Sequence, residues 1–411
     1  MTALATAPAT PPATFPLDHP PIASRWPRYE PDEIEAAVGV LSTGRVNSLV
    51  HGEQTKAFEE EFAAYCGAPF AIAVGNGTLA LELALRALGV GPGDEVIVPA
   101  RSFFATVSCV AAVGAAAVFA DIDPVSQNID PRSAHRLITR RTKALICVHL
   151  GGWPCDMETL REITREHGLF LIEDCAQAHG ATYHGRRAGS FGDAAAFSFC
   201  TDKIMSTAGE GGMLLLQDEA HHDRAWAYKD HGKSLEKLRQ PSQPGMFRYV
   251  HDSFGSNFRL TELQSAIGRR QLGKLPAWLA QRRANAAILL EALGDVPGIV
   301  LPKAPEHVEH AFYKFNFLIP GTGLNRAQIL RALGEAGVPA AAGTCPDMSQ
   351  EHAFAGAGFV NPAPLPAAAM VGARNVTLPV DHTLSTEEMQ RMGAQVRDCL
   401  LRSPRLMERV Q

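Results

Sequence analysis

The sequence predicts an α/β protein whose core is a largely parallel sheet covered by helices. Apolar runs typical of strands alternate with amphipathic runs typical of helices between about residues 70 and 175, and this alternation indicates such a sheet. At 411 residues with 46% hydrophobic side chains, the chain has ample apolar surface for a core. Because such sheets bind ligands beyond the carboxyl ends of their strands, polar residues at those ends are the candidates for a site.

The first two thirds of the chain supply the sheet. Two helices are expected at 31–41 and about 53–65, separated by a loop at 44–52. The strands expected after them are 71–74, 95–99, 117–120, 143–148, 169–172, 194–199 and 213–216. The helices expected between these strands are 79–88, one from about 105, one after 131, and 157–167.

Helical patterns dominate after the sheet. A long helix is expected from about 260 to 293, followed by a strand-like run at 310–320 and a helix at 326–335. A terminal helix is expected from about 385 to 402, because Ser385 and Glu388 are spaced as a capping box.

We expect four segments: a tail at 1–24, a large domain at 25–260, a connecting helix at 261–290 and a small domain at 291–411. The tail is rich in Ala, Thr and Pro and lacks the basic region and apolar core of a signal peptide, so we expect it to be disordered. No apolar run approaches the roughly 20 residues that a membrane span requires. With a net charge of −5 and no long run of either sign, we expect a cytoplasmic protein that binds neither nucleic acid nor membrane.

The eight cysteines form no C-x-x-C pair, and several lie inside apolar runs. This pattern predicts buried free thiols in a reducing compartment, with no disulfide framework and no metal site.

Lys203 is the first candidate for chemistry. It follows the apolar strand at 194–199 and precedes the glycine-rich run Gly209–Gly212. A lysine at the mouth of a strand can form a Schiff base with pyridoxal phosphate (PLP), and its amine can then act as a general base. Since the chain has 38 Lys and Arg residues, most of them solvated, Lys203 alone is a weak indication.

Two further strand ends carry suitable groups. Gly77 and Thr78 lie between a strand and a helix, where backbone N–H groups and the helix N-terminus favour a phosphate, although a plain turn and N-cap would look the same. Asp174 ends another strand and could pair with a pyridine nitrogen, although a helix cap or surface residue is the ordinary alternative. Gln177 could donate to the ring's phenolate oxygen.

Phe103 lies just past a third strand end, where an aromatic side chain can stack on a flat ring, although a core position is commoner. The run 254–264 by itself indicates only a loop and an N-cap.

Together and in this order, these pieces resemble the DegT/DnrJ/EryC1/StrS family of sugar aminotransferases. The resemblance covers about residues 25 to 400, and the run from Ile172 to Gly212 is its most specific part. It implies a PLP enzyme of fold type I, with a mostly parallel mixed sheet in a large domain and a smaller C-terminal α/β domain.

The resemblance also implies roles at the ring. Lys203 forms the Schiff base and moves the proton, Asp174 pairs with the pyridine nitrogen, Gln177 contacts the phenolate oxygen and Phe103 stacks on the ring. Lys203 and Asp174 are therefore the expected catalytic residues.

Other roles concern the cofactor's phosphate. Gly77, Thr78 and Ser198 hold it, and a loop of the neighbouring subunit, here Asn257 and Arg259, completes the site. The resemblance thus implies a homodimer with shared active sites.

The implied reaction moves an amino group from glutamate or glutamine to a keto sugar, commonly nucleotide-linked, in amino-sugar or secondary-metabolite biosynthesis. A keto-inositol or other cyclitol is the alternative acceptor, because Arg25–Tyr29 and Gly255–Arg259 resemble a branch with cyclitol and aminohydroxybenzoate-forming members. Cys200–Asp202 and Gly343–Pro346 depart from the commonest family pattern, which leaves the acceptor open.

Three other readings are weaker. Related PLP-dependent sugar dehydratases replace the lysine, so Lys203 argues against that class. A non-catalytic regulator or PLP-binding scaffold would be expected to carry an appended DNA-binding helix pair, which we do not find. A nicotinamide-binding enzyme would need G-x-G-x-x-G, of which Gly75–Ala80 supplies only the first half.

Overall fold

A computed structural model describes residues 20–49, 52–241, 247–321, 325–354 and 364–402. Its centre is a seven-stranded sheet in the order β1-β9-β8-β5-β4-β2-β3. These strands are β1 (Phe70–Val74), β2 (Glu95–Pro99), β3 (Ala116–Ala120), β4 (Thr142–Val148), β5 (Phe170–Asp174), β8 (Ala194–Ser198) and β9 (Gly212–Leu216). β9 alone is antiparallel to its neighbours, β1 and β8. The predicted largely parallel sheet is confirmed.

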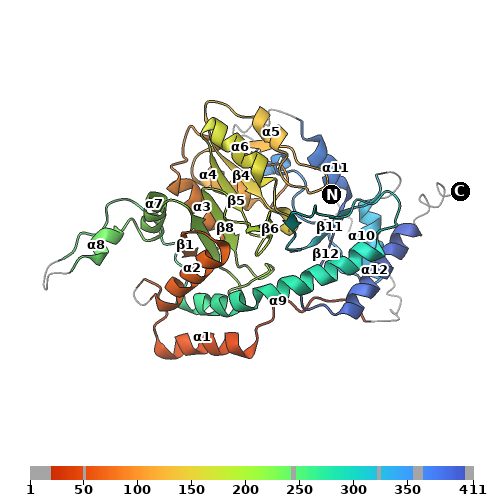
Figure 1. The fold of residues 1–411 in the computed structure, drawn as a ribbon, viewed down its shortest axis with the longest axis horizontal. Coiled ribbons are helices and arrows are strands. Elements are labelled where there is room, and N and C mark those ends of the chain that lie inside the picture. The colour runs from red at the N-terminus through yellow and green to blue at the C-terminus, as the bar shows by residue number, and fades with distance from the viewer. Residues whose placement is uncertain (1–19, 50–51, 242–246, 322–324, 355–363, 403–411) are drawn as a thin grey trace, which may run out of the picture.

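The helices alternate with these strands as predicted (Figure 1). The helices up to the sheet's last strand are α1 (Pro31–Thr43), α2 (Glu53–Cys66), α3 (Gly77–Ala87), α4 (Ala105–Ala112), α5 (Pro131–Arg136) and α6 (Met157–His167). The later helices are α7 (Glu219–Lys229), α8 (Leu235–Arg239), α9 (Glu262–Ala292), α10 (Arg326–Glu335), α11 (Pro366–Arg374) and α12 (Thr386–Leu401). Short 3-10 turns are η1 (Leu150–Gly152), η2 (Met348–Gln350) and η3 (His352–Phe354).

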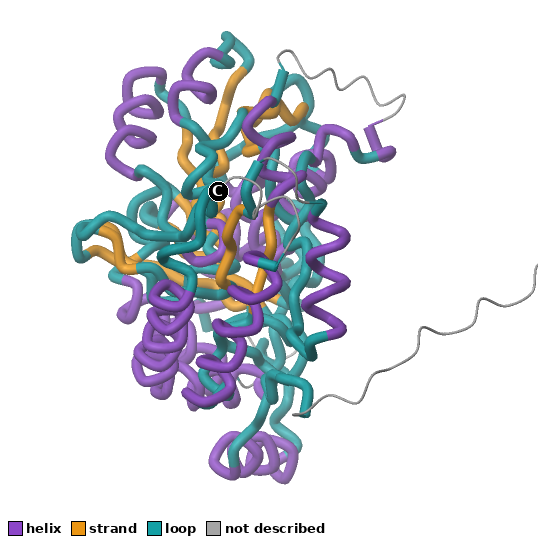
Figure 2. Tube along the Cα trace, turned by 90° about the vertical axis from the view of Figure 1, so that its right-hand side faces the viewer, coloured by secondary structure: helices purple, strands orange, loops and turns teal. Residues whose placement is uncertain are grey.

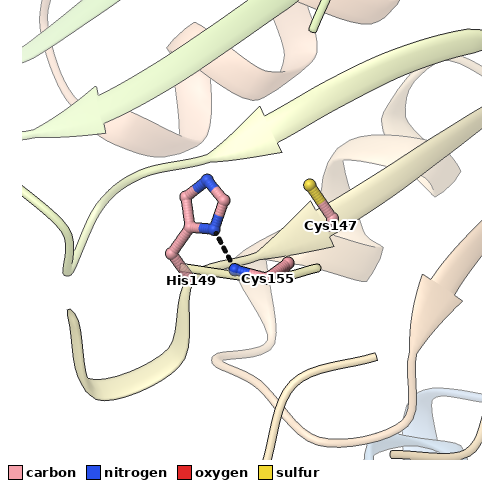
Figure 3. Close-up of side chains that lie close together, drawn as sticks. All are labelled: Cys147, His149 and Cys155. Carbon is pink, nitrogen blue, oxygen red and sulfur yellow. Dashed lines mark hydrogen bonds between the residues drawn. The ribbon is translucent and has the colours of Figure 1, made fainter. Parts of the chain in front are cut away.

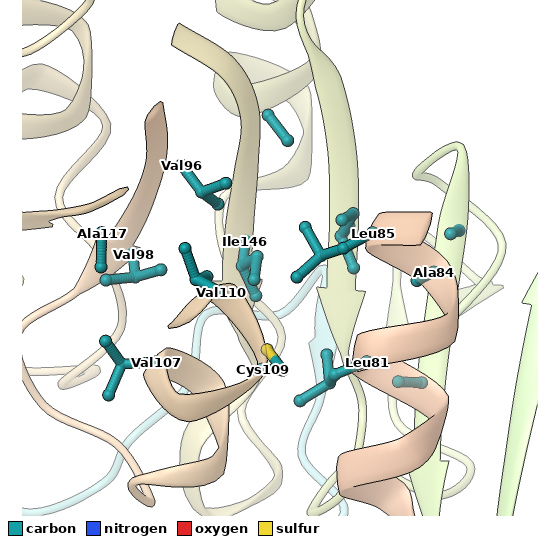
Figure 4. Packing of buried hydrophobic residues seen from close by; sticks show 14 of the residues in the cluster. Leu81, Ala84, Leu85, Val96, Val98, Val107, Cys109, Val110, Ala117 and Ile146 are labelled. Carbon is teal, nitrogen blue, oxygen red and sulfur yellow. The ribbon is translucent and has the colours of Figure 1, made fainter. Parts of the chain in front are cut away.

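The sheet is buried on both faces, with helices on either side of the strands (Figure 2). Alternate residues of one strand point to opposite faces. On β2, Val96 and Val98 pack under α3 and α4 (Figure 4), whereas Ile97 belongs to the core under α5 and α6. On β8, Phe197 packs against α2 and α9 on that second face. Burial on both faces explains why these strands are continuous apolar runs.

The long helix α9 has 31 residues and packs against α1, α2 and α12. It begins with a capping box between Thr261 and Gln264 and runs along the lower edge of the molecule in Figure 1. At its far end lies a two-stranded sheet of β11 (Phe315–Leu318) and β12 (Asn375–Leu378), with α10 and α12. The predicted capping box of Ser385 and Glu388 is present at the N-terminus of α12. The domain boundaries at 260 and 290 stay a prediction.

The remaining strands are short, and the sequence did not indicate them. β6 (Thr182–Tyr183) pairs with both β7 (Arg186–Arg187) and β10 (Val308–Glu309). The strand-like run expected at 310–320 is strand only in β11, because the residues before it turn into the cavity described below.

Most of the predicted tail, residues 1–19, lies outside the described residues. Within its remaining part Ile22 is buried, and its N–H donates to the Gly337 carbonyl. The chain is therefore packed before residue 25, which the sequence did not suggest. All eight cysteines are free thiols; five are buried as predicted, whereas Cys200, Cys345 and Cys399 are only half-buried. In the part of the chain that the structure describes, no helix is both long and apolar enough to cross a membrane.

Candidate active site

A cavity of about 610 Å³ lies at the carboxyl ends of β5 and β8 and at the start of α3. It lies where parallel sheets bind ligands. Seven of the predicted site residues line it: Gly77, Thr78, Phe103, Asp174, Gln177, Ser198 and Lys203. These residues belong to four separate sequence motifs, and the fold brings the four motifs together at one cavity.

The first turn of α3 forms one end of the cavity. The Asn76 side chain caps the helix by accepting the Leu79 N–H at 2.9 Å. Ser198, at the end of β8, lies so close that a Cβ atom on Gly77 would be 2.7 Å from its Cβ. The helix N-terminus and the Thr78 and Ser198 hydroxyls make this end of the cavity suitable for a dianion such as a phosphate.

Substituting Gly77 by alanine tests this arrangement. The new methyl group would displace Ser198, so we expect Gly77→Ala to weaken PLP binding about 10-fold or more, equivalent to roughly one hydrogen bond to a charged group. Fluorescence titration of the apoprotein with PLP measures the change. Gly334→Ala is the matched control, because a Cβ there meets nothing within 4 Å on helix α10. Equal PLP affinity in both variants would contradict the assignment.

Asp174 is 6% exposed and lies in the floor of the cavity. Its carboxylate accepts hydrogen bonds from Thr106 Oγ1 at 3.0 Å and from the Ala176 N–H at 3.1 Å. Burial raises the pKa of Asp174, against the effect of these bonds. No cationic side chain among the described residues pairs with it, so it is suited to the protonated nitrogen of a bound ring.

Glu173 faces the other side of β5 and anchors the strand. It accepts from His149 Nε2 at 3.0 Å and from the backbone N–H groups of Gly189, Phe191 and Gly192. Burial by itself would raise the pKa of Glu173, but these donors hold it below its usual value.

Cys147, on the neighbouring strand β4, His149 and Cys155 place side-chain atoms that could bind a metal within 4.8 Å of one another (Figure 3). His149 Nδ1 already accepts the Cys155 N–H at 3.0 Å, and its Nε2 is bonded to Glu173. Neither ring nitrogen has a lone pair left for a metal. We therefore read the cluster as a support for β5.

Gln177 and Phe103 present complementary groups to the cavity. Gln177 Oε1 accepts the Gly151 N–H at 2.7 Å, which leaves its amide NH₂ group to donate to a ligand. Phe103 is 65% exposed, so it is not the core residue that the ordinary reading of a phenylalanine suggests. A flat ring in the cavity could be stacked and hydrogen-bonded by these two side chains.

The Lys203 amine is held by two groups. Its Nζ lies 3.5 Å from Tyr313 Oη and 3.5 Å from Asp202 Oδ1, and the Tyr313 hydroxyl donates to Asp202. Burial and Asp202 raise the pKa of Tyr313, so this hydroxyl stays protonated. The sequence did not indicate Tyr313, because it lies 110 residues further along the chain.

The segment before α1 makes hydrogen bonds to the chain around Lys203. The Trp26 indole N–H donates to the Lys203 carbonyl at 2.7 Å, and the Tyr29 hydroxyl lies 3.1 Å from Ser206 Oγ. Trp26 is itself packed edge-on against Trp278 of α9. The motif at 25–29 therefore fixes the backbone that carries Lys203.

Asn257 and Arg259 do not line this cavity. Asn257 is exposed, and Arg259 pairs with buried Asp230 at 2.9 Å. The remaining wall comes from residues that the sequence did not single out for this role, namely Arg101, Lys314, Asn316 and Thr377. Gly343 and Thr344, in the run that departs from the commonest family pattern, also line it.

Comparison with known proteins agrees with this geometry. The profile of the DegT/DnrJ/EryC1/StrS aminotransferase family matches residues 27–397. An aminotransferase structure from Psychrobacter cryohalolentis superimposes with a TM-score of 0.89 at 40% identity, covering 92% of this chain and 99% of that one.

Two curated relatives differ in what they make. The dTDP-3-amino-3,4,6-trideoxy-α-D-glucose transaminase of Streptomyces venezuelae is 40% identical over 284 residues, covering 69% of this chain and 71% of the relative. The 3-amino-5-hydroxybenzoate synthase of Amycolatopsis mediterranei is 38% identical over 317 residues, covering 77% and 79%.

Proposed function

The chain belongs to the DegT/DnrJ/EryC1/StrS aminotransferase family, and from this premise we propose that it aminates a nucleotide-linked keto sugar, with glutamate or glutamine as amino donor. It is a PLP-dependent aminotransferase. The observation that carries the proposal is the convergence of Lys203, Asp174 and Gln177 on one cavity. The nucleotide sugar acceptor rests on relatives such as the Streptomyces venezuelae transaminase.

The cavity fits PLP at each part of that molecule. The start of α3, with Gly77, Thr78 and Ser198, would hold the phosphate, and Asp174 would face the ring nitrogen. The free NH₂ of Gln177 would donate to the phenolate oxygen. Phe103 would cover one face of the ring.

Bound PLP supplies an electron-accepting ring that stabilises the charge left when a substrate α-proton is removed. The protein's part is to position groups around that event. Lys203 Nζ would take up and return the proton, and Tyr313 with Asp202 would hold the amine at the right place between transfers. The donor gives up its amino group first and leaves as a keto acid, after which the keto acceptor takes the amine by the reverse steps.

A visible absorption spectrum of the purified protein, before and after glutamate or glutamine is added, tests the function. We expect a yellow protein that bleaches with one of these donors and regains its colour with a nucleotide-linked keto sugar. A protein that stays colourless after PLP is added would contradict the proposal. If a keto-inositol restores the colour and no nucleotide sugar does, the acceptor is a cyclitol.

We further propose that the active enzyme is a homodimer with shared sites. One face of α1 exposes Ile34, Val38 and Leu41 by 52%, 54% and 58%, and such an apolar stripe suits a protein interface. The segment around α8 projects from the body in Figure 1 and exposes Tyr249 and Phe254. Since Asn257 follows this segment, is exposed and does not line the cavity of its own subunit, it would serve the partner's phosphate.

Mixing two inactive variants tests the sharing. Lys203→Ala removes the amine, and Asn257→Asp would put a negative charge beside the partner's phosphate. With shared sites, a hybrid dimer has one site with both defects and one with neither, so we expect about half the wild-type activity per hybrid. Hybrids as inactive as their parents would contradict sharing, and an active monomer in sedimentation would contradict the dimer.

A further inference from the structure

Arg101 is a buried cation at the wall of the cavity. It lies two residues beyond the end of β2, is 1% exposed and is among the largest fully buried side chains of the described chain. It nevertheless lines the cavity. Only an edge of its guanidinium can therefore reach a molecule bound there.

This cation has no ion-pair partner among the described residues. Its Nε donates to Gln127 Oε1 at 3.0 Å, and its Nη1 lies 3.5 Å from the Thr344 carbonyl oxygen. Across the described ranges, no carboxylate lies within ion-pair distance of it. Burial, together with the nearby charge of Arg326, lowers the pKa of Arg101 to about 10. A buried charge left unpaired is costly to folding, which calls for a reason at this position.

Arg282 is a second fully buried arginine of the described chain. Arg282 is equally buried, but it lies in the favourable field of the Asp381 carboxylate and does not line the cavity. Arg282 can thus be explained as part of the fold. The cation of Arg101 instead adjoins the space that a substrate fills.

A polar network fixes the guanidinium. Gln127 accepts from Arg101 and donates from Nε2 to Asn375 Oδ1 at 2.8 Å, while its backbone adopts a φ of 64°. This conformation is costly for a residue other than glycine. Asn375 in turn donates to Thr377 Oγ1 at 3.1 Å, and Thr377 donates to Asn316 Oδ1 at 2.6 Å.

Two donors on this wall remain without an acceptor in the described chain, Arg101 Nη2 and Asn316 Nδ2. A Cβ on Gly343 would be 3.4 Å from Arg101 Nη2 and 2.7 Å from Thr377 Oγ1, which donates to Asn316 Oδ1. Asn316 Nδ2 lies beside Gly151, whose N–H donates to Gln177. Both residues line the cavity that holds the proposed reaction centre.

We propose that Arg101 and Asn316 form a subsite that binds a carboxylate group of a substrate. This deepens the proposed function and rests on it. A guanidinium edge and an amide NH₂ match the two oxygens of a carboxylate. The carboxylate can come from two sources, the α-carboxylate of the amino donor or an acid group on a cyclic keto acceptor.

The test uses the PLP-loaded enzyme and pairs of ligands with and without a carboxylate. L-glutamate and benzylamine are titrated as donors, and bleaching of the visible band is measured. 3-Oxocyclohexanecarboxylate and cyclohexanone are titrated as acceptors, and the return of the visible band is measured. Arg101→Gln keeps a donor for Gln127, and Arg326→Gln is the matched control, because it removes a neighbouring charge that does not line the cavity.

We expect Arg101→Gln to raise the half-saturating concentration of a carboxylate ligand about 10- to 100-fold, the effect of losing a charged hydrogen bond. The carboxylate-free ligand of the same pair should change less than about twofold. A shift with glutamate assigns a carboxylate of the donor, and a shift confined to the keto acid assigns the acceptor. If neither acceptor reacts with the wild type, the donor pair decides.

Unchanged titrations in Arg101→Gln, or equal losses with both members of a pair, would overturn the subsite. If Arg101→Gln does not fold, Asn316→Ala carries the same test, with an expected loss of about 5-fold. A wild-type protein that reacts with no donor at all would instead refute the proposed function, so the two failures are distinguishable.

Discussion

Replacing Lys203 by alanine is expected to lower the transamination rate by about 10⁴-fold or more, because the change removes both the Schiff-base amine and the general base. Single-turnover bleaching with glutamate measures this loss. PLP should still bind through the start of α3, but the variant should lack the Schiff-base absorption band of the wild type. Full turnover in this variant would overturn the central assignment.

The surroundings of Lys203 make the prediction specific. Its side chain is 15% exposed, and the Trp26 indole donates to its carbonyl, so the backbone that carries its amine is held in place. Lys314 also lines the cavity and serves as the control position, because its amine lies over the Tyr313 ring but makes no hydrogen bond to the Tyr313 hydroxyl and no ion pair with Asp202 among the described residues. Lys314→Ala is expected to keep the yellow colour. Unfolding curves show whether each variant is folded.

Replacing Asp174 by alanine is expected to lower the rate of the donor half-reaction by about 10²- to 10³-fold, as for loss of a buried charged partner in the transition state. The carboxylate would keep the ring nitrogen protonated, and this positive charge makes the ring an electron acceptor. Since burial raises the pKa of Asp174, a cationic ring nitrogen would also stabilise its ionised form.

Asp174→Asn removes the negative charge of the side chain but keeps its shape. The amide can still bond to Thr106 and accept from the Ala176 N–H, so the fold should survive while the rate falls almost as far as in Asp174→Ala. Asp218→Asn, which changes only the N-cap of α7, is the control. An Asp174→Asn variant with an unchanged rate would remove the proposed role of the carboxylate.

The parts of this protein that are encoded locally could be predicted from the sequence. Up to residue 175, the strands are apolar runs and the helices are amphipathic runs that can be recognised in the sequence. Gly77, Asp174 and Gln177 lie at or just beyond the ends of these strands. Lys203 and Ser198 also lie in one short run at the end of β8. A parallel sheet aligns strand ends at one edge, so these residues converge without any long-range information.

The parts that depend on distant contacts could not be predicted. The apolar face of α1 looks like an ordinary core stripe in the sequence, yet Ile34, Val38 and Leu41 are exposed. Ile22 lies in a segment whose composition suggests disorder, yet it is buried. Burial of each residue depends on whether another part of the chain covers it, which periodicity cannot show.

The fold class, the cofactor and the residues expected to act on it follow from local motifs, because each motif combines a strand end with a chemically suitable side chain. The other residues that line the cavity come together only in the folded chain. Tyr313, which contacts Lys203, lies 110 residues from it in the chain. Thr344, whose carbonyl oxygen lies beside the unpaired charge of Arg101, lies 243 residues from Arg101. Whether a charge is buried and lacks a partner is a property of packing, and no local pattern records it.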